Sequence, residues 1–155
     1  MKPADYHRPK TLQEAWRLKD EIPGSLFIAG GTDLMVRIKN RQLHPPAMIS
    51  LRGVPDLAGI RQEGTTRVGA LTTITDLIQH HGLATEHPLL IEAARRLGST
   101  QIRNAATLGG NLCNASPCAD TATALLALEA RLEIEGPQGR RVIPLSEFFL
   151  GPGQT

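Results

Sequence analysis

Two glycine pairs, each followed by small polar residues, are the part of this sequence best suited to chemistry. The first, GGTD, occupies positions 30–33 directly after the apolar run 26–29. The second, TLGGN, occupies positions 107–111 and is followed by the polar segment 114–117 and by Asp120. Glycine lets backbone N–H groups approach an anion without a Cβ in the way, and hydroxyl and amide side chains add donors. A strand that runs through such a turn into a helix predicts a phosphate site, and two such sites predict a ligand with adjacent phosphates, such as a dinucleotide.

The competing interpretation is structural, because a Gly-Gly pair in a loop usually forms only a turn. The sequence also lacks the G-x-G-x-x-G spacing of the Rossmann fingerprint and the G-x-x-x-x-G-K-[ST] spacing of the P-loop. We therefore expect any dinucleotide site in this chain to belong to another architecture.

Composition narrows the class of protein. The 155 residues are enough for one domain or two small lobes, and 41% hydrophobic with 21% charged residues is typical of a globular protein. A net charge of +2 without a basic run argues against nucleic acid as a partner. No apolar stretch reaches the ~18 residues of a membrane span, and the N-terminus lacks the apolar region of a signal peptide. Cys113 and Cys118 fit neither a disulfide framework nor a common metal spacing, so we expect a cytoplasmic protein with reduced thiols and no metal ligands.

The first ~55 residues carry the pattern of a small α/β lobe. Thr11 with Glu14 three residues later predicts the start of a helix that ends at Pro23. The apolar run 25–29 predicts a buried strand, the spacing after Asp33 predicts a helix, and segment 47–51 predicts a second strand.

The remaining residues predict a second, mixed lobe with antiparallel strands and helices. Segment 98–117 shows little periodicity and is expected to be a functional stretch without regular structure. His80 and His81 are expected to end a helix, where a positive charge suits the helix dipole. The other expected elements are strands at 57–62 and 65–70, helices at 73–80, 87–97 and 119–128, and a hairpin at 131–135 and 140–143.

Taken together and in order, these motifs resemble the FAD-binding subunit of the molybdenum hydroxylases, a family that includes xanthine dehydrogenase and carbon monoxide dehydrogenase. The similarity covers the whole chain, and it is nearest to bacterial xanthine-dehydrogenase-like subunits. It is carried by YHRP at 6–9, FIAGGTDL at 27–34, LRGVPDLAGI at 51–60, VGALTTITDL at 68–77, GSTQIRNAATLGGNLCNASPCAD at 98–120, LLALEA at 125–130 and GPGQT at 151–155.

The resemblance implies an α+β, two-lobed FAD-binding fold of the molybdopterin dehydrogenase type, with the diphosphate between lobes 1–55 and 56–155. It also implies a C-terminal portion that this chain does not contain. For Asp33 the competing role is capping of the following helix, and for Arg103 a contact to the backbone near the second motif competes with a surface role. The implied cofactor-binding residues are Phe27, Ile28, Ala29, Gly30, Gly31, Thr32, Asp33, Leu34, Leu97, Thr107, Leu108, Gly109, Gly110, Asn111, Ser116 and Asp120.

The same resemblance implies an oxidoreductase component with no catalytic side chains of its own. FAD would receive electrons from the [2Fe–2S] clusters of one partner subunit, downstream of a molybdopterin-binding subunit, and would pass them to NAD or another acceptor. One alternative is a truncated or split subunit that serves as a non-catalytic assembly module without flavin. Another is a free-standing flavin oxidoreductase, although no acid–base pair or nucleophile stands out.

Overall fold

The computed structural model describes residues 4–155, and the N-terminal part of the chain is built around a three-stranded parallel sheet. The strand order is β1-β3-β2, with β1 at Asp5–His7, β2 at Leu26–Ile28 and β3 at Ala47–Ser50. Phe27 pairs with Ile49, which is completely buried. Parallel strands end at the same edge of a sheet, so the segments that follow β2 and β3 lie next to each other.

Two helices connect these strands. α1 (Leu12–Glu21) begins where the sequence predicts: the Thr11 hydroxyl accepts a hydrogen bond from the Glu14 amide at 3.1 Å, and the Glu14 carboxylate accepts one from the Lys10 amide at 2.8 Å. Trp16 of α1 packs edge-on against Phe27 of β2, with ring centroids 5.1 Å apart. α2 (Leu34–Lys39) follows the first glycine pair. The strands and helices predicted for the first ~55 residues are therefore present, with β1 as an additional strand.

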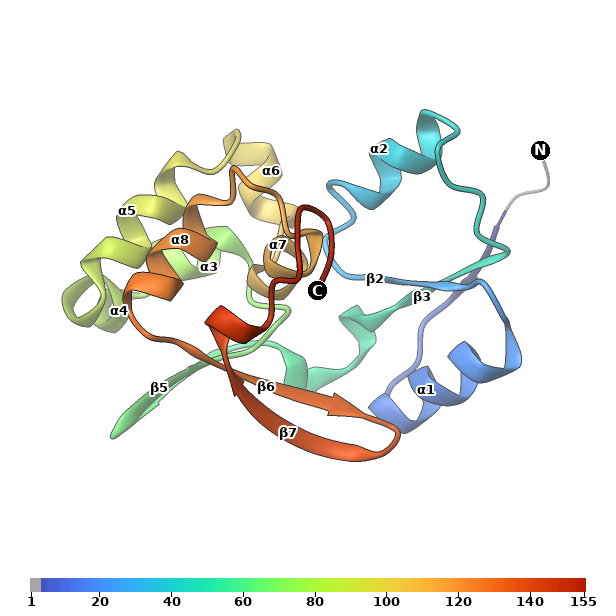
Figure 1. Cartoon of the computed structure of the whole chain (residues 1–155), viewed down its shortest axis with the longest axis horizontal. Helices are drawn as coiled ribbons and strands as arrows, with labels where there is room; N and C mark the ends of the chain where they lie inside the picture. The colour runs from blue at the N-terminus through green and yellow to red at the C-terminus, as the bar shows by residue number, and fades with distance from the viewer. Residues whose placement is uncertain (1–3) are drawn as a thin grey trace.

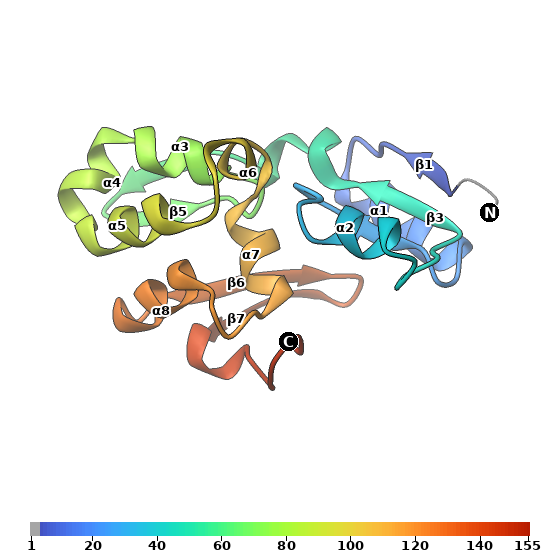
Figure 2. The same cartoon turned by 90° about the horizontal axis from the view of Figure 1, so that it is seen from above.

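The rest of the chain consists of two antiparallel hairpins and a group of short helices. Figures 1 and 2 show α3, α4, α5, α6 and α8 gathered at one end of the molecule, the parallel sheet at the other, and α7 between them. The elements are the 3-10 turns η1 (Leu51–Gly53) and η2 (Pro55–Leu57), β4 (Ile60–Glu63), β5 (Thr65–Val68), α3 (Ile74–Gln79), α4 (His81–Glu86), α5 (Pro88–Arg96), α6 (Thr100–Ala105), α7 (Leu108–Asn114), α8 (Asp120–Ala127), β6 (Arg131–Gly136), β7 (Gly139–Pro144) and the turn η3 (Leu145–Glu147).

Two hydrophobic clusters hold this part together. The larger joins α3, α4, α5 and the chain around the second glycine motif, and consists of Ile74, Leu77, Leu83, Ile91, Ala94, Ala106 and Leu108. The smaller joins α7, α8 and η3 through Leu112, Ala119, Ala122 and Leu145. Leu108 and Leu112 lie one turn apart on the same face of α7 and belong to different clusters, so α7 packs against both.

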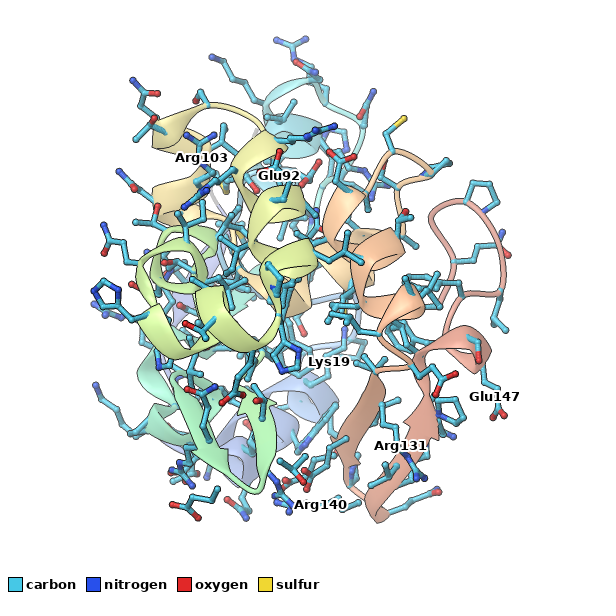
Figure 3. The ribbon with its side chains drawn as sticks, turned by 90° about the vertical axis from the view of Figure 1, so that its left-hand side faces the viewer. Lys19, Glu92, Arg103, Arg131, Arg140 and Glu147 are labelled. Atoms are coloured by element: carbon cyan, nitrogen blue, oxygen red, sulfur yellow. The ribbon has the colours of Figure 1, made fainter. Side chains whose placement is uncertain are left out.

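The β6–β7 hairpin extends from the helical end toward α1 (Figure 1). Its tip, at Gly136 and Arg140, faces Leu12 and Trp16 across an open groove of about 470 Å³. Figure 3 shows Arg140 and Arg103 at opposite ends of the molecule, Arg103 on the helical side. The hairpin thus lies alongside both parts of the fold.

Several sequence predictions are wrong in detail. Segment 98–117 is not structureless, because it contains α6 and α7, whose N-caps are Ser99 and Thr107. His80 does not simply end a helix: its Nδ1 accepts a hydrogen bond from the Leu83 amide at 3.2 Å and so begins α4. The strand predicted at 57–62 starts only at Ile60, since residues 55–57 form the turn η2.

Among residues 4–155, every helix is too short or too polar to cross a lipid bilayer.

Candidate functional site

The two glycine segments, far apart in the sequence, lie against each other in the fold. A methyl group added at Gly110 would lie 3.8 Å from the Cβ of Ala29, which directly precedes the first glycine pair. A methyl group added at Gly30 would overlap the carbonyl oxygen of Ala105 and lie 2.9 Å from its carbonyl carbon. The end of β2 and the approach to α7 are therefore in direct contact, as a shared site requires.

Arg52 joins the two segments. Its Nε donates to the carbonyl of Ala29 at 3.1 Å, and its Nη2 donates to the carbonyl of Ala105 at 3.4 Å. The sequence motifs predict no role for Arg52 itself. The available signal was its place two residues after β3, at the sheet edge where the parallel strand β2 also ends.

The first glycine segment is open to an anion. Gly31 adopts φ +78°, a conformation that favours glycine. Within residues 4–155, the amides of Gly30, Gly31 and Thr32 donate no hydrogen bond to a protein acceptor. These N–H groups are donors without a partner at the carboxyl end of β2, which is the arrangement that backbone anion sites use.

Asp33 does not cap α2. It occupies the N-cap position with α-helical torsion angles and makes no capping hydrogen bond, so the predicted capping role is wrong. Among residues 4–155, the exposed carboxylate of Asp33 accepts a hydrogen bond from the Thr32 hydroxyl alone, at 3.5 Å. This carboxylate is free to accept a hydrogen bond from a bound ligand.

The second glycine pair lies inside a helix rather than in a loop. Gly109 packs closely against the 70–73 segment, since a methyl group there would lie 2.7 Å from the Cβ of Ala70. The first amides of α7 all donate within the protein: Leu108 to the Thr72 carbonyl at 3.0 Å, Gly109 to the Ala70 carbonyl at 2.8 Å, Gly110 to the Thr107 hydroxyl at 3.1 Å and Asn111 to the Thr107 carbonyl at 2.9 Å. This segment therefore differs from the first, because its amides are already hydrogen-bonded.

The Thr107 hydroxyl is expected to contribute measurably to stability. Thr107 is buried, and replacing it with valine keeps its shape but leaves the Gly110 amide without its capping acceptor. We expect Thr107→Val to lower the free energy of unfolding by about 1–2 kcal/mol, measured by urea denaturation. Thr107→Ser keeps the hydroxyl and should cost less. An equal loss in both variants would mean that the methyl group, not the cap, is what matters.

The other predicted residues lie on neighbouring elements. Phe27 and Ile28 are part of β2, and Leu34 begins α2. Leu97 is half-buried and packs against the cluster that contains Leu108. The Ser116 hydroxyl accepts a hydrogen bond from the Cys118 amide at 3.3 Å and so shapes the turn before α8.

Asp120 is exposed in the first turn of α8, which is tied to α7 next to it. The buried Thr121 hydroxyl donates to the Asn111 side-chain oxygen at 2.5 Å. The start of α8 is thereby held against the second glycine motif.

Arg103 does bond to backbone carbonyls, which was one of its two expected roles. The carbonyls are at the end of α5, however, and not near the second glycine motif. Nη1 of Arg103 donates to the carbonyls of Arg95, Leu97 and Gly98 at 3.3, 3.0 and 2.8 Å. These are the carbonyls at the C-terminal end of α5, where a cation is stabilising. Arg103 therefore fixes the α5–α6 corner and, with it, the backbone of Leu97.

Cys113 offers no reactive thiolate. Cys113 and Cys118 are both free and lie at the surface. The protein atoms packed around the Cys113 thiol desolvate it and raise its pKa, which keeps the thiol protonated at neutral pH. Within residues 4–155, no three His, Cys, Asp or Glu side chains are grouped so as to hold a metal ion.

Comparison with known proteins assigns this arrangement to a family. Residues 2–155 match the family model described as the FAD binding domain in molybdopterin dehydrogenase. The chain belongs to this family. It therefore carries an FAD-binding domain, as the resemblance implied.

Individual relatives support the same assignment. The chain is 37% identical to the xanthine dehydrogenase FAD-binding subunit of Escherichia coli O157:H7 over 154 residues, which are 98% of this chain and 53% of that protein. It is 39% identical to the carbon monoxide dehydrogenase medium chain of Hydrogenophaga pseudoflava, over 97% of this chain and 53% of that one. It thus spans about half the length of the curated relatives that it matches.

A solved structure confirms the fold. Carbon monoxide dehydrogenase from Hydrogenophaga pseudoflava, in a form that lacks the Mo-pyranopterin moiety, matches all of this chain with a TM-score of 0.95 and 37% identity, over 55% of its own chain. The α+β fold of the FAD subunit is therefore present here in a chain that covers part of its length.

Proposed function

We propose that this chain holds the FAD diphosphate at the junction of the first glycine segment and α7. The observation that carries the proposal is the direct contact of these two segments, with the Gly30, Gly31 and Thr32 amides left without protein acceptors. An FAD diphosphate fits this arrangement, because it supplies the anionic oxygens that these donors lack. The lobes that meet there are residues 1–55 and 56–155.

The two segments would contribute differently to binding. The first would donate its free amides and the Thr32 hydroxyl to phosphate oxygens, while the Asp33 carboxylate would accept from a hydroxyl or N–H group of the cofactor. The second would act mainly through shape, because Gly109 and Gly110 keep α7 close to its neighbours without side chains that fill the space. Leu97, Ser116 and Asp120 would line the same region.

We further propose that the chain serves electron transfer in a molybdenum hydroxylase complex. FAD, when bound, exchanges electrons singly or in pairs and so can link one-electron centres to a two-electron acceptor. The proposed partners are a [2Fe–2S] subunit and a molybdopterin-binding subunit in the cytoplasm, with NAD or another molecule as acceptor. Relatives named as subunits or medium chains of xanthine and carbon monoxide dehydrogenases support this role.

The composition of the native complex tests this proposal. We expect a tagged chain, expressed in its own organism, to be purified with FAD, iron and molybdenum in fixed ratios, measured by flavin release and elemental analysis. Isolation of the chain with FAD but without iron or molybdenum would favour a free-standing flavoprotein. Isolation with both metals but no FAD would favour the assembly module.

A further inference from the structure

Arg52 occupies the one point in the described residues from which a side chain bonds to the backbone leading into both glycine motifs. Its two acceptors, the carbonyls of Ala29 and Ala105, lie 23 and 53 residues away in the sequence. The Ala105 carbonyl oxygen is also the nearest atom that a methyl group added at Gly30 would meet. The guanidinium therefore bonds to the same carbonyl that closes off the space beside Gly30.

The charge of this guanidinium is not balanced by the protein. Among residues 4–155, the ion pairs involve other residues, and no carboxylate pairs with Arg52. Its two hydrogen bonds use Nε and Nη2, which leaves Nη1 without a protein acceptor in the same range. Guanidinium groups present several donors in one plane and are well suited to phosphate oxygens.

Two independent features thus point to an anion at one place. The backbone amides of Gly30, Gly31 and Thr32 are donors without acceptors, and Arg52 bonds to the carbonyl of the residue that directly precedes them. A diphosphate bound there would meet neutral donors from the glycine segment and a positive charge from the adjacent strand end.

We propose that Arg52 is a positioning residue for the dinucleotide: it sets the spacing of the two glycine segments and supplies the positive charge beside the diphosphate. This inference rests on the proposed function, because it takes the junction of the two segments as the FAD site. Arg52 does not react; it acts by holding two carbonyls and by its charge.

The first experiment measures FAD affinity by quenching of flavin fluorescence. We expect Arg52→Met to raise the Kd of the chain for FAD by about 10- to 100-fold, the range of a lost charge-assisted hydrogen bond. Arg52→Lys should restore part of the affinity, since it keeps the charge. The ratio of mutant to wild-type Kd should shrink as salt is raised from 50 to 500 mM, because salt screens an exposed charge.

Arg131→Met is the matched control, since Arg131 is an exposed arginine on β6 (Figure 3) and belongs to neither glycine segment. Its FAD affinity should equal that of the wild type. If wild-type and Arg52→Met chains bind FAD equally well, the inference is wrong while the proposed function stands. If the loss in Arg52→Met is neither rescued by lysine nor reduced by salt, Arg52 acts only through structure and the charge role is wrong.

A second experiment needs no flavin and separates the two hypotheses. Amide hydrogen exchange of the FAD-free chain should become faster in Arg52→Met at Met35 and Ala106, whose amides donate to the carbonyls of Gly31 and Ile102 beside the two segments. Exchange at both amides should be unchanged in Arg131→Met. If the wild-type chain binds no FAD, the proposed function fails for this chain, and unchanged exchange in Arg52→Met would then overturn the positioning role as well.

Discussion

Replacing Gly30 with alanine should sharply weaken FAD binding and destabilise the fold. The added methyl group would overlap the Ala105 carbonyl oxygen and approach the Cα of Ala106 to 3.0 Å. Both neighbours are backbone atoms, so the strain can be relieved only by moving β2 and α6 apart. Overpacking of this kind costs about 2–3 kcal/mol. FAD binding requires the two segments in contact, so this strain energy opposes binding. The Kd for FAD should therefore rise by about 30- to 150-fold.

The matched control for this variant is Gly136→Ala. Gly136 lies in β6, and a methyl group added there would meet no atom within 4 Å. The control should keep wild-type FAD affinity and should unfold within about 0.5 kcal/mol of the wild type. If Gly30→Ala binds FAD as tightly as the control, the close approach of the two segments is not required for the site.

Among the proposed variants that introduce no steric clash, removal of the Arg103 guanidinium should cause the largest loss of stability. In Arg103→Met the carbonyls of Arg95, Leu97 and Gly98 lose a charged donor at the C-terminal end of α5. A hydrogen bond to a charged group contributes about 1.5–3 kcal/mol to stability. Because a single guanidinium nitrogen, Nη1, donates to all three carbonyls, the three bonds do not add in full. We expect the free energy of unfolding to fall by about 3 kcal/mol, measured by urea denaturation.

Arg96→Met is the control for Arg103→Met. Arg96 is an exposed neighbour whose side chain pairs with Glu92 one turn away at 3.2 Å, and such surface pairs contribute at most about 0.5 kcal/mol. Figure 3 shows Glu92 and Arg103 at the same helical end of the molecule, so both variants change the charge of one region. Equal effects in the two variants would mean that Arg103 acts through surface charge and not by capping α5.

Local signals in the sequence were sufficient for the elements whose stability is local. The Thr11 hydroxyl does cap α1, and the turn between Gly136 and Gly139 does join the two strands of the last hairpin. The strand after α1 and the strand at 47–50 were also predicted, because their apolar runs lie between clear turn residues.

Elements that depend on distant partners were not predictable in this way. β1 has only three residues and exists because it pairs with β3 about 40 positions later. α7 contains two glycines, which disfavour a helix, and its first turn depends on the carbonyls of Ala70 and Thr72. A single sequence carries no local signal for such bonds, so the sequence predicts a loop where α7 forms.

The same limit applies to the candidate site. The two glycine motifs were evident from residue type, and their contact followed from the family resemblance. The role of Arg52 in joining them depends on carbonyls 23 and 53 residues away, and no spacing rule connects these positions. The structure is therefore needed to identify contacts between charged side chains and distant backbone carbonyls, such as those of Arg52.

FAD binding by the purified 155-residue chain tests the central claim most directly. Flavin fluorescence during titration, followed by the visible spectrum after desalting, gives both the Kd and the amount of cofactor retained. We expect saturable binding of one FAD per chain, weakened by about 30- to 150-fold in Gly30→Ala and unchanged in Gly136→Ala. A chain that is folded by circular dichroism but shows no quenching of flavin fluorescence would contradict a diphosphate site formed by these two segments.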